Sequence, residues 1–410
     1  MSATCRYCAR PLDLELIDLG RQPLANSYLD PTPEAIAAEQ CYPLRVLVCE
    51  ACFLAQVEQA VPPEAIFHRD YAYFSSHSTS WVAHAERYAA AMTERFKLGA
   101  ASMVVEIASN DGYLLQHFAK RGIPCLGIEP AGKCAEAARA KGLDTVVAFF
   151  SADTARRLAA EGVAADLTVA NNVLAHVPAI AEFVAGFPLI LKPEGVATFE
   201  FPHLLRMIAD TQFDTIYHEH YSYLSLGVVE RIFAGHGLRV FDVEPLPTHG
   251  GSLRVFACHG EARHAETPRV AHTRQEEASA ALDRAEGYRF FALRAAEMRD
   301  ALRRFLDDAK ARGVRVAAYG AAAKGNTFLN FCRADASDIA FVVDRNPEKQ
   351  GRVLPGSHIP VRDPAALRAE RPEAVLILPW NLAGEITAEH AYVSEWGGRF
   401  FLAAPRLRML

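Results

Sequence analysis

Six side chains that can exchange protons or stabilise negative charge lie within seven residues of this chain. They are Tyr217, His218, Glu219, His220, Tyr221 and Tyr223, in the segment Phe213–Ser225 (FDTIYHEHYSYLS). Imidazole, carboxylate and phenol groups side by side can take up a proton, return it and stabilise an oxyanion. The same residue types also occur in solvated turns, and two of them could hold a metal ion. We favour catalysis because an acid, a base and several phenols occur together.

Two further clusters of reactive side chains are cysteine pairs near the N-terminus. Cys5-x-x-Cys8 and Cys49-x-x-Cys52 are separated by 40 residues. Four thiolates in two such pairs suit tetrahedral zinc and leave no open position for a substrate water. The chain has nine cysteines and begins without an apolar signal segment, which argues against a disulfide framework. We therefore expect a structural four-cysteine zinc site in a small lobe that zinc helps to fold.

The chain between and after the cysteine pairs predicts paired strands and then a helix. Leu14–Leu19 and Tyr42–Val48 alternate or run apolar, as paired strands do. Trp81–Phe96 has a helical pattern, and the polar, aromatic loop before it contains Tyr71 and Tyr73. That loop fits either the wall of a pocket or a capped helix entry.

A nucleoside-binding pattern follows. A short β-branched run ends at Glu106, turns through small residues to Gly112 and enters a helix, and the next strand ends at Glu129. Strand, loop, helix, strand and terminal acid are typical of a nucleoside-binding βαβ unit, in which the acid binds ribose hydroxyls. The loop has the E-x-G-x-G-x-G spacing of S-adenosylmethionine-dependent methyltransferases, with Ala108 and Asn110 in place of two glycines. This spacing favours S-adenosylmethionine over NAD.

Alternating helices and strands continue this unit. The strand Asp166–Ala170 leads into Asn171 and His176, and the carboxyl end of a parallel strand faces the ligand crevice. We expect Asn171 to meet the cofactor, and His176 either to face the substrate or to bind backbone at a helix entry. His249-Gly-Gly-Ser-Leu-Arg254 predicts a hairpin turn whose arginine could meet a phosphate. Helices are expected at 132–141, 153–160, 183–191 and 226–236, and strands at 195–201, 238–243 and 252–258.

A second Rossmann-like pattern occupies the C-terminal part. The run 262–312 predicts long helix, because it is rich in Ala, Arg and Glu with opposite charges at helical spacing. A strand, the small-residue loop Gly320–Asn326 and a helix follow, and the helix N-terminus could bind phosphate with Lys324 adding charge. Further strands are expected at 339–343 and 375–380. A docking domain without a ligand would show the same pattern.

Composition limits the classes of function. A chain of 410 residues suits two or three domains, and 51% apolar with 22% charged residues is ordinary for a globular protein. A net charge of −6 argues against nonspecific nucleic-acid binding. No apolar run is long enough to cross a membrane, so we expect a cytoplasmic protein with no membrane or nucleic-acid partner. No coiled-coil seam demands a dimer, and we expect a monomer.

Taken together, these motifs resemble the S-adenosylmethionine-dependent C-methyltransferases of deoxysugar biosynthesis, which add a methyl branch to a nucleotide-linked 4-keto sugar. The resemblance covers nearly the whole chain. It rests on the two cysteine pairs and on EIASNDGYLL, NVLAHV, FDTIYHEHYSY, HGGSLR and GAAAKGNT, in that order. It implies an α/β fold with a zinc-binding lobe (1–67), a Rossmann-like class I methyltransferase domain (68–300) and a second Rossmann-like domain (301–410). The substrate is expected between the last two.

The resemblance also implies a role for each motif. The four paired cysteines would hold zinc. The cofactor would be surrounded by Glu106, Ala108, Asn110, Gly112, Tyr113, Glu129 and Asn171. The reacting centre would be lined by Tyr71, His176, Tyr217, Glu219 and His220, with His220 as the base. The nucleotide-sugar substrate would meet His249, Arg254, Gly320, Lys324 and Asn326.

These roles form a coherent reaction. A carbon next to a ketone is acidic enough for a positioned histidine to deprotonate it, and neutral imidazole is abundant at pH 7. We expect His220 to take the proton and Glu219 to orient a neighbouring group, while Tyr217 and His176 stabilise the enolate oxygen. The enolate carbon would then attack the sulfonium methyl in line. The favoured substrate is a dTDP-linked 4-keto deoxysugar methylated at C3, with C5 as the other candidate.

Two other functions fit parts of the sequence. An O- or N-methyltransferase acting on a sugar or small molecule would use the same cofactor fold. A nonenzymatic zinc- and nucleotide-binding scaffold would use the same clusters without turnover. An NAD-dependent epimerase or reductase fits less well, because Glu106–Gly112 lacks the dinucleotide glycines.

Overall fold

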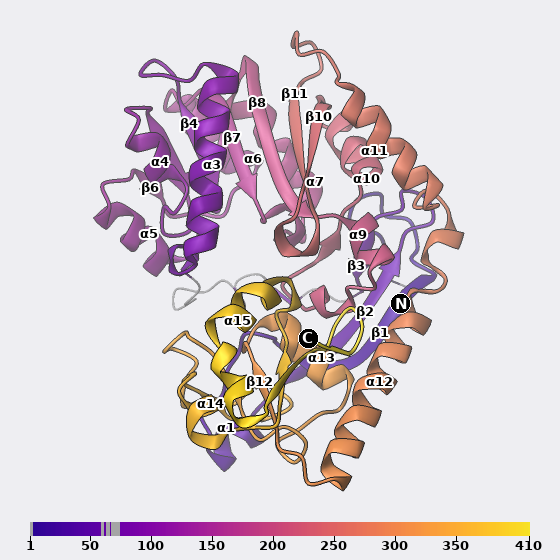
Figure 1. The fold of residues 1–410 in the computed structure, drawn as a ribbon. Helices are drawn as coiled ribbons and strands as arrows, with labels where there is room; N and C mark the ends of the chain where they lie inside the picture. Colours follow the sequence, from indigo (N-terminus) through magenta and orange to yellow (C-terminus); the bar gives the residue numbers. More distant parts are fainter. Residues whose placement is uncertain (1–2, 59–60, 63–65, 67–73) are drawn as a thin grey trace.

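The computed structural model describes residues 3–58, 61–62, 66 and 74–410. Their strands form three β-sheets (Figure 1). The N-terminal sheet contains β1 (Leu14–Pro23), β2 (Cys41–Val48), β3 (Ala55–Val57) and β9 (Ser222–Tyr223), in that order. All of its pairings are antiparallel, which confirms the expected strand pair on either side of α1 (Pro33–Ala37). The fourth strand, β9, belongs to the segment Phe213–Ser225 from the middle of the chain.

The central sheet has seven strands in the order β10-β11-β8-β7-β4-β5-β6. These are β4 (Val104–Ile107), β5 (Cys125–Ile128), β6 (Thr145–Val146), β7 (Ala165–Asn171), β8 (Leu191–Pro202), β10 (Leu238–Leu246) and β11 (Ser252–His259). Only β11 runs against its neighbours in this sheet. Buried parallel strands require near-continuous apolar runs, and β4 and β7 supply them. This strand order confirms the expected Rossmann-like methyltransferase core.

Helices connect these strands in the upper half of Figure 1. They are α3 (Thr79–Phe96), α4 (Leu115–Ala119), α5 (Gly132–Ala140), α6 (Ala152–Ala160), α7 (Ile180–Ala185), α8 (Phe187–Ile190), α9 (Leu204–Ala209), α10 (Leu226–Ala234) and α11 (Pro268–Ser279). Serine side chains cap three of them: Ser78 begins α3, Ser151 begins α6 and Ser225 begins α10. Each hydroxyl accepts a hydrogen bond from a first-turn N–H that would otherwise lack a partner in the helix.

The C-terminal sheet lies in the lower half of Figure 1 and has the order β14-β13-β12-β15-β16-β17. Its strands are β12 (Val316–Tyr319), β13 (Val342–Val343), β14 (Val361–Arg362), β15 (Ala374–Ile377), β16 (Arg399–Leu402) and β17 (Arg408–Met409). The first five are parallel, and β17 is antiparallel at the edge. Its helices are α13 (Ala323–Phe331), α14 (Ala366–Glu370) and α15 (Ala383–Glu389), with α12 (Phe291–Ala311) leading into it. A second Rossmann-like domain is therefore present, as expected.

Two expected helices are broken. The run 262–312 forms α11 and α12 rather than one helix, because Ala281 is left-handed (φ 57°) and a Cβ at Gly287 would lie 2.4 Å from the Ala281 carbonyl oxygen. The helix expected at 183–191 ends at Ala185, and a second begins at Phe187 with a proline in its first turn. Composition does not reveal either break, since both depend on packing.

The N-terminal lobe shares an apolar core with each of the other sheets. Leu16, Val46 and other residues of β1 and β2 belong to the same buried cluster as Leu302 of α12 and Phe328 of α13. On the opposite side, Cys5, Cys49 and Cys52 are clustered with residues of α10. The lobe therefore joins the central and C-terminal sheets.

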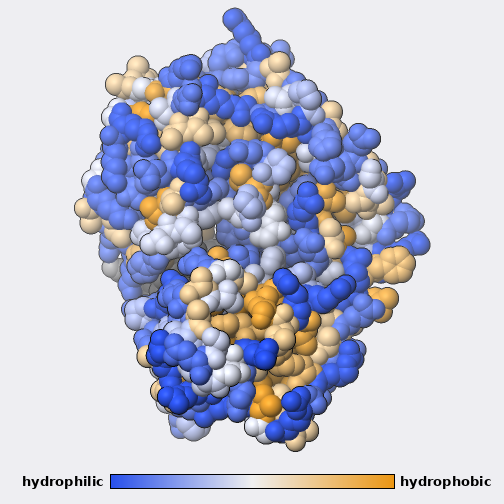
Figure 2. Space-filling model, viewed as in Figure 1, coloured by the Kyte–Doolittle hydropathy of each residue, from blue (hydrophilic) through white to orange (hydrophobic). Residues whose placement is uncertain are grey.

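The surface is largely hydrophilic on the face drawn in Figure 2, and its hydrophobic side chains gather over the C-terminal part near the chain end. Met409 and Leu410 are among the exposed large apolar residues. Within the described ranges, no helix has both the length and the apolar character needed to cross a bilayer.

Candidate active site

The segment Phe213–Ser225 contacts elements of all three parts of the chain. Its end forms β9, which pairs with β3 of the N-terminal lobe (Ala55 with Tyr223). Near its start, the Ile216 carbonyl accepts a hydrogen bond from Thr327 Oγ1 of α13 over 2.9 Å. Ser225 then caps α10 of the central domain. The cluster of titratable groups therefore lies where the three parts of the chain meet.

His220 lies at the centre of this cluster and has a defined tautomer. Its Nδ1 donates to the Thr215 carbonyl over 2.7 Å, and because a carbonyl only accepts, Nε2 carries the lone pair. The His220 ring centroid is 4.7 Å from that of His176 and 4.0 Å from that of Tyr217. His176 arrives from the short helix Leu174–His176 after β7. The structure thus brings together three of the predicted reacting-centre residues.

The surroundings of both histidine rings keep them neutral. Burial, followed by the proximity of His176, holds the pKa of His220 well below its ordinary value. Burial lowers the pKa of His176 to about 4. An imidazole that is neutral at pH 7 can accept a proton from a carbon acid.

Glu219 is a buried carboxyl with an unusual proton affinity. It is 5% exposed, and burial raises its pKa to about 7. Its Oε1 accepts a hydrogen bond from Asn26 Nδ2 over 2.6 Å. Asn26 belongs to the loop between β1 and α1, so the N-terminal lobe contacts this acid directly.

His218 and Tyr221 face the N-terminal lobe. His218 Nε2 donates to the Pro43 carbonyl in β2 over 3.2 Å. The Tyr221 hydroxyl donates to the Val61 carbonyl, and the Tyr221 carbonyl accepts from Arg6 Nη1 over 3.0 Å. These contacts anchor the segment to the lobe, whereas the His220 ring packs against His176 of the central domain.

The predicted cofactor loop keeps a glycine-type backbone although two of the three glycines are replaced. Ala108, Asn110 and Gly112 have φ values of 56°, 50° and 76°, all in the left-handed region. At Gly112 a Cβ would be strained by the φ of 76° and would lie 2.2 Å from Leu143 Cδ1, so glycine is favoured there. The departures at 108 and 110 therefore change the residues but preserve the path of the loop.

Acidic and amide groups surround this loop at the carboxyl ends of the strands. Glu129 accepts the backbone N–H groups of Asn110 (2.9 Å) and Ala131 (2.8 Å). Burial, and then the charges of Glu129 and Asp111, raise the pKa of Glu106, whose Oε2 has no hydrogen-bond partner among the described residues. Both amide atoms of Asn171, which is 7% exposed, also lack one within the described ranges. Orphaned buried groups at this edge fit a bound polar ligand, as S-adenosylmethionine requires.

Aromatic rings from α3 lie beside the cofactor loop. Trp81 stacks on Tyr113 with ring centroids 6.0 Å apart and on His84 at 4.8 Å. The Trp81 ring also makes an edge contact with His249 at 5.1 Å. Two of the predicted ligand-binding residues, Tyr113 and His249, are therefore linked through Trp81.

The C-terminal loop expected to bind the nucleotide faces the same region. Lys324 Nζ donates to the His249 carbonyl over 3.2 Å and lies 5.0 Å from the Trp380 ring. Trp380 Nε1 donates to Asp214 Oδ2 over 2.7 Å. Burial raises the pKa of Asp214, while the charge of Lys324 opposes that rise, and burial lowers the pKa of Lys324. Lys324 is thus the cation of this loop that lies against the predicted catalytic segment.

The other predicted residues of this loop have structural contacts. A Cβ at Gly320 (φ 92°) would lie 2.4 Å from Pro379 Cδ, so glycine is needed for close packing. Asn326 donates from Nδ2 to the Ala25 carbonyl over 3.2 Å. Its Oδ1 is buried and has no partner in the part of the chain that the structure describes.

Arg254 has different surroundings from those expected. Its guanidinium donates to Glu200 (2.9 Å) and Glu244 (2.8 Å) and lies over the Tyr88 ring. Burial acts to raise the pKa of Glu200, yet His84 and Arg254 bring it down to about 2. Glu200 also accepts from Thr248 Oγ1 over 3.0 Å. Arg254 therefore supports the loop that carries His249 and is already paired with two carboxylates.

Sequence reasoning missed several contributors to this region. Asn26, Trp81, Glu200 and Trp380 belong to no motif that signals their partners. Asp214 lies in the motif FDTIYHEHYSY, but nothing in that motif indicates its bond to Trp380. Tyr71, a predicted reacting-centre residue, lies outside the described residues.

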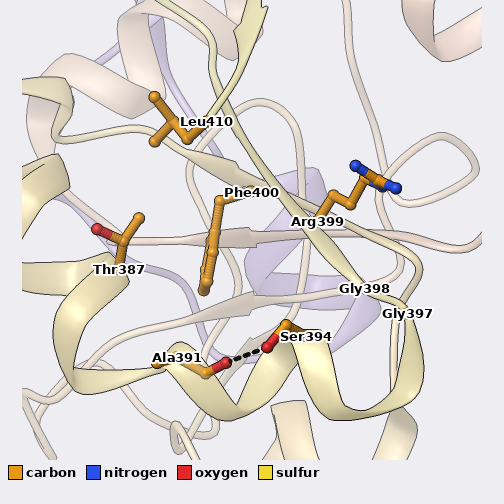
Figure 3. A pocket seen from close by; sticks show the side chains of 8 residues that line it. All are labelled: Thr387, Ala391, Ser394, Gly397, Gly398, Arg399, Phe400 and Leu410. Atoms are coloured by element: carbon orange, nitrogen blue, oxygen red, sulfur yellow. Dashed lines mark hydrogen bonds between the residues drawn. The ribbon is translucent and has the colours of Figure 1, made fainter.

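Two surface hollows lie away from this cluster. One of about 340 Å³ is at the edge of the C-terminal sheet, and Figure 3 shows Phe400 and Leu410 on one side and the Ser394–Ala391 hydrogen bond on the other. A second of about 570 Å³ lies between α9 and α11. Neither is lined by a predicted site residue.

The four paired cysteines form a compact cluster whose sulfurs all lie within 4.8 Å of one another. Cys5 and Cys52 sulfurs are 3.5 Å apart, and those of Cys8 and Cys49 are 3.4 Å apart. Zn–S bonds of about 2.3 Å in tetrahedral geometry place sulfurs about 3.8 Å apart. The donor set and its spacing therefore fit zinc.

The whole sequence also matches known families and proteins. Family profiles match a zinc binding domain over residues 5–67, a methyltransferase domain over 81–243 and a C-methyltransferase C-terminal domain over 247–405. The chain is 36% identical over 406 residues to the C-methyltransferase NovU of Streptomyces niveus, which covers 99% of this chain and 96% of NovU.

Two solved structures resemble about half of the chain each. PH0226 from Pyrococcus horikoshii is 14% identical with a TM-score of 0.38, covering 46% of this chain and 94% of that one. The 1,6-didemethyltoxoflavin-N1-methyltransferase of Burkholderia thailandensis, with bound S-adenosylhomocysteine, is 16% identical with a TM-score of 0.38, covering 51% and 95%. Similarity this low carries no weight for function. The whole-chain identity does, and the protein belongs to the S-adenosylmethionine-dependent C-methyltransferase family that has an N-terminal zinc-binding domain and includes NovU.

Proposed function

We propose that this enzyme methylates the carbon next to the ketone of a nucleotide-linked 4-keto deoxysugar, with dTDP as the nucleotide and C3 as the favoured carbon. The observation that carries the proposal is the His220 tautomer, in which Nδ1 is bound to Thr215 and Nε2 is a neutral base. A carbon nucleophile must be made by removing a proton, whereas an oxygen or nitrogen nucleophile already has its lone pair. The whole-chain similarity to a C-methyltransferase supports this choice.

The residues around the left-handed loop would hold S-adenosylmethionine. They are Glu106, Ala108, Asn110, Gly112, Tyr113, Glu129 and Asn171. The unpartnered polar atoms of Glu106 and Asn171, counted among the described residues, support this assignment. When bound, this cofactor supplies the electrophilic methyl group.

The chain's own groups carry the proton chemistry. His220 Nε2 accepts the proton from the carbon, and the Thr215 carbonyl stabilises the imidazolium through Nδ1–H. Tyr217 and His176, whose rings lie against His220, stabilise the developing enolate oxygen. Glu219, as a carboxylate, orients a neighbouring group. Tyr71 retains its proposed place at the reacting centre from the sequence resemblance.

The nucleotide diphosphate of the substrate would lie against the C-terminal loop. Lys324 supplies positive charge beside His249, and Gly320 and Asn326 shape the loop. Arg254 acts indirectly in this proposal, because its guanidinium is paired with Glu200 and Glu244.

We further propose a monomer whose domains divide near residues 67 and 300. The zinc-binding profile, which ends at residue 67, supports the first division, whereas the C-terminal profile begins earlier than the proposed second division, at residue 247. Nine cysteines, none of them in a disulfide, support a reducing, cytoplasmic compartment, and the net charge of −6 supports the absence of a nucleic-acid partner.

Solvent exchange tests the proposal. The enzyme is incubated in D₂O with a panel of 4-keto nucleotide sugars, first without and then with S-adenosylmethionine, and products are analysed by mass spectrometry and NMR. We expect deuterium at the carbon next to the ketone without cofactor, and a new C–CH₃ group with it. Methylation of an oxygen or nitrogen without exchange would contradict the proposal, as would no turnover with any sugar of the panel.

A further inference from the structure

Asn26 reaches the predicted catalytic segment from the zinc-binding lobe. Its Nδ2 donates to Glu219 Oε1 over 2.6 Å. Asn26 is exposed as a residue, whereas Glu219 is almost entirely buried. The bond therefore connects a surface loop of the lobe to a buried acid more than 190 residues away in the chain.

The loop that carries Asn26 is held on its other side by the C-terminal domain. The Ala25 carbonyl accepts from Asn326 Nδ2 over 3.2 Å, and the Tyr28 hydroxyl donates to the Ala321 carbonyl. Asn26 is thus fixed between Glu219 and the loop Gly320–Asn326. An anchored donor loses little entropy when it forms its bond, so it can define the orientation of the carboxyl.

Among the described residues, no charged side chain forms an ion pair or hydrogen bond with the Glu219 carboxyl beside the bond from Asn26. Tyr28 approaches Glu219 from the same loop, and burial raises the pKa of Tyr28. His176 bonds to the Glu219 backbone, and burial lowers its pKa to about 4. His220, the next residue, also has a depressed pKa. These three groups are neutral at pH 7, so the Asn26 amide is the polar contact that favours a carboxylate at Glu219.

We propose that Asn26 is a positioning residue, whose amide fixes the orientation of Glu219 and favours its carboxylate form during the proposed methyl transfer. The zinc-binding lobe then completes the catalytic centre in addition to holding metal. The kinetic part of this inference rests on the proposed function, whereas the Asn26–Glu219 coupling does not.

A kinetic test compares Asn26→Ala with Ser27→Ala, a matched control because Ser27 is the exposed neighbour on the same loop. The probe is dTDP-4-keto-6-deoxyglucose, with exchange in D₂O and methylation both measured from pH 5.5 to 9. For Asn26→Ala we expect kcat at pH 7 to fall about 10-fold or more, with unchanged S-adenosylmethionine affinity. The pH of half-maximal rate should also move upward, because the carboxylate has lost a donor.

Two results complete the kinetic test. Asn26→Gln, which retains an amide, should recover part of kcat, whereas a purely structural role would leave the pH of half-maximal rate unchanged in every variant. Equal kcat and equal pH profiles for Asn26→Ala, Ser27→Ala and wild type would overturn the inference. Absence of exchange and methylation in the wild type would instead count against the proposed function.

A substrate-free test measures the coupling directly. Thermal stability is followed from pH 5 to 8.5 for wild type, Asn26→Ala, Glu219→Gln and the double variant. The loss caused by Asn26→Ala should grow with pH when Glu219 is present, since an ionised buried acid then lacks its donor. In the Glu219→Gln background, the loss should be smaller and constant with pH. Additive, pH-independent effects would overturn the inference.

Discussion

His220 owes its basic nitrogen to one backbone contact. The Thr215 carbonyl fixes the proton on Nδ1, and burial keeps the ring neutral. His218, two residues earlier, uses its Nε2 to hold the Pro43 carbonyl. Two histidines in one short segment therefore have different contacts, because one ring bonds to the N-terminal lobe and the other to its own segment.

That difference gives a matched pair of variants. We expect His220→Asn to lower exchange and methylation by about 10²-fold or more, because the proposed base is lost. His218→Asn should keep near wild-type kcat at a cost of about 1 kcal/mol in stability, since it loses one hydrogen bond to backbone. S-adenosylmethionine binding by calorimetry verifies that both variants are folded. Equal losses in the two variants would refute this assignment.

Glu219 makes stability depend on pH. Its pKa of about 7 in the folded protein lies above the ordinary 4.5, so the folded state holds the proton more tightly than the unfolded state. The free energy of unfolding should therefore fall as pH rises from about 4.5 to about 7, by on the order of 3 kcal/mol from this group. Glu219→Gln does not titrate and should gain stability relative to wild type over that interval. Denaturant unfolding of both proteins at several pH values measures this gain. A difference in unfolding free energy that stays constant with pH would contradict the prediction.

At the scale of elements, the loop after β4 holds a strained backbone. Ala108 has a left-handed φ of 56°, which costs an L-residue about 1–2 kcal/mol. Ala108→Gly should therefore stabilise the protein by about 0.5–1 kcal/mol and preserve cofactor affinity. Thermal unfolding and calorimetry measure the two effects. A loss of stability would show that the Ala108 methyl contributes packing that outweighs the strain.

Gly112→Ala serves as the opposite case in the same loop. It would place a Cβ 2.2 Å from Leu143 Cδ1 at a φ of 76°, so it should destabilise the protein and weaken cofactor binding.

The elements that sequence predicted best are those encoded by local pattern. The βαβ unit from β4 to Glu129, the hairpin of β10 and β11 and the start of the C-terminal domain follow from hydrophobic periodicity and small-residue turns. The path of the proposed cofactor loop was also predictable, because the spacing is kept where Ala108 and Asn110 replace glycines.

Features set by distant partners were not predictable. Arg254 looked available for a phosphate, but its carboxylate partners lie on other strands. Asn26 has no local signal for its bond to Glu219. The break between α11 and α12 depends on the packing of Gly287 against Ala281. Such contacts join residues that no local pattern connects.

At the scale of the molecule, the cysteine cluster supports more than its own lobe. Cys5, Cys49 and Cys52 share an apolar core with α10, and Arg231 of α10 donates to the Cys52 carbonyl. Loss of the metal should therefore loosen α10 and the segment before it, as well as the two cysteine pairs.

Cys8→Ser and Cys41→Ser test this role of zinc. Cys8 is one of the four clustered sulfurs, whereas Cys41 lies outside the cluster. We expect Cys8→Ser to lower the zinc content and to lower Tm by about 5–10 °C, with Cys41→Ser unchanged in both. Metal analysis and calorimetry provide the measurements. A full zinc content in Cys8→Ser would rule out the four-cysteine site.

The pairing of β3 with β9 also bears on how the chain is made. The paired residues are more than 160 positions apart, a stretch that a ribosome takes about 10–30 s to synthesise. During that interval the β3 edge lacks its β9 neighbour, and an open edge can pair with other chains. Thr327, whose hydroxyl donates to the Ile216 carbonyl, is synthesised later still. Lowering the concentration of nascent chains should therefore raise the soluble yield, and the first 67 residues produced alone should be prone to aggregate.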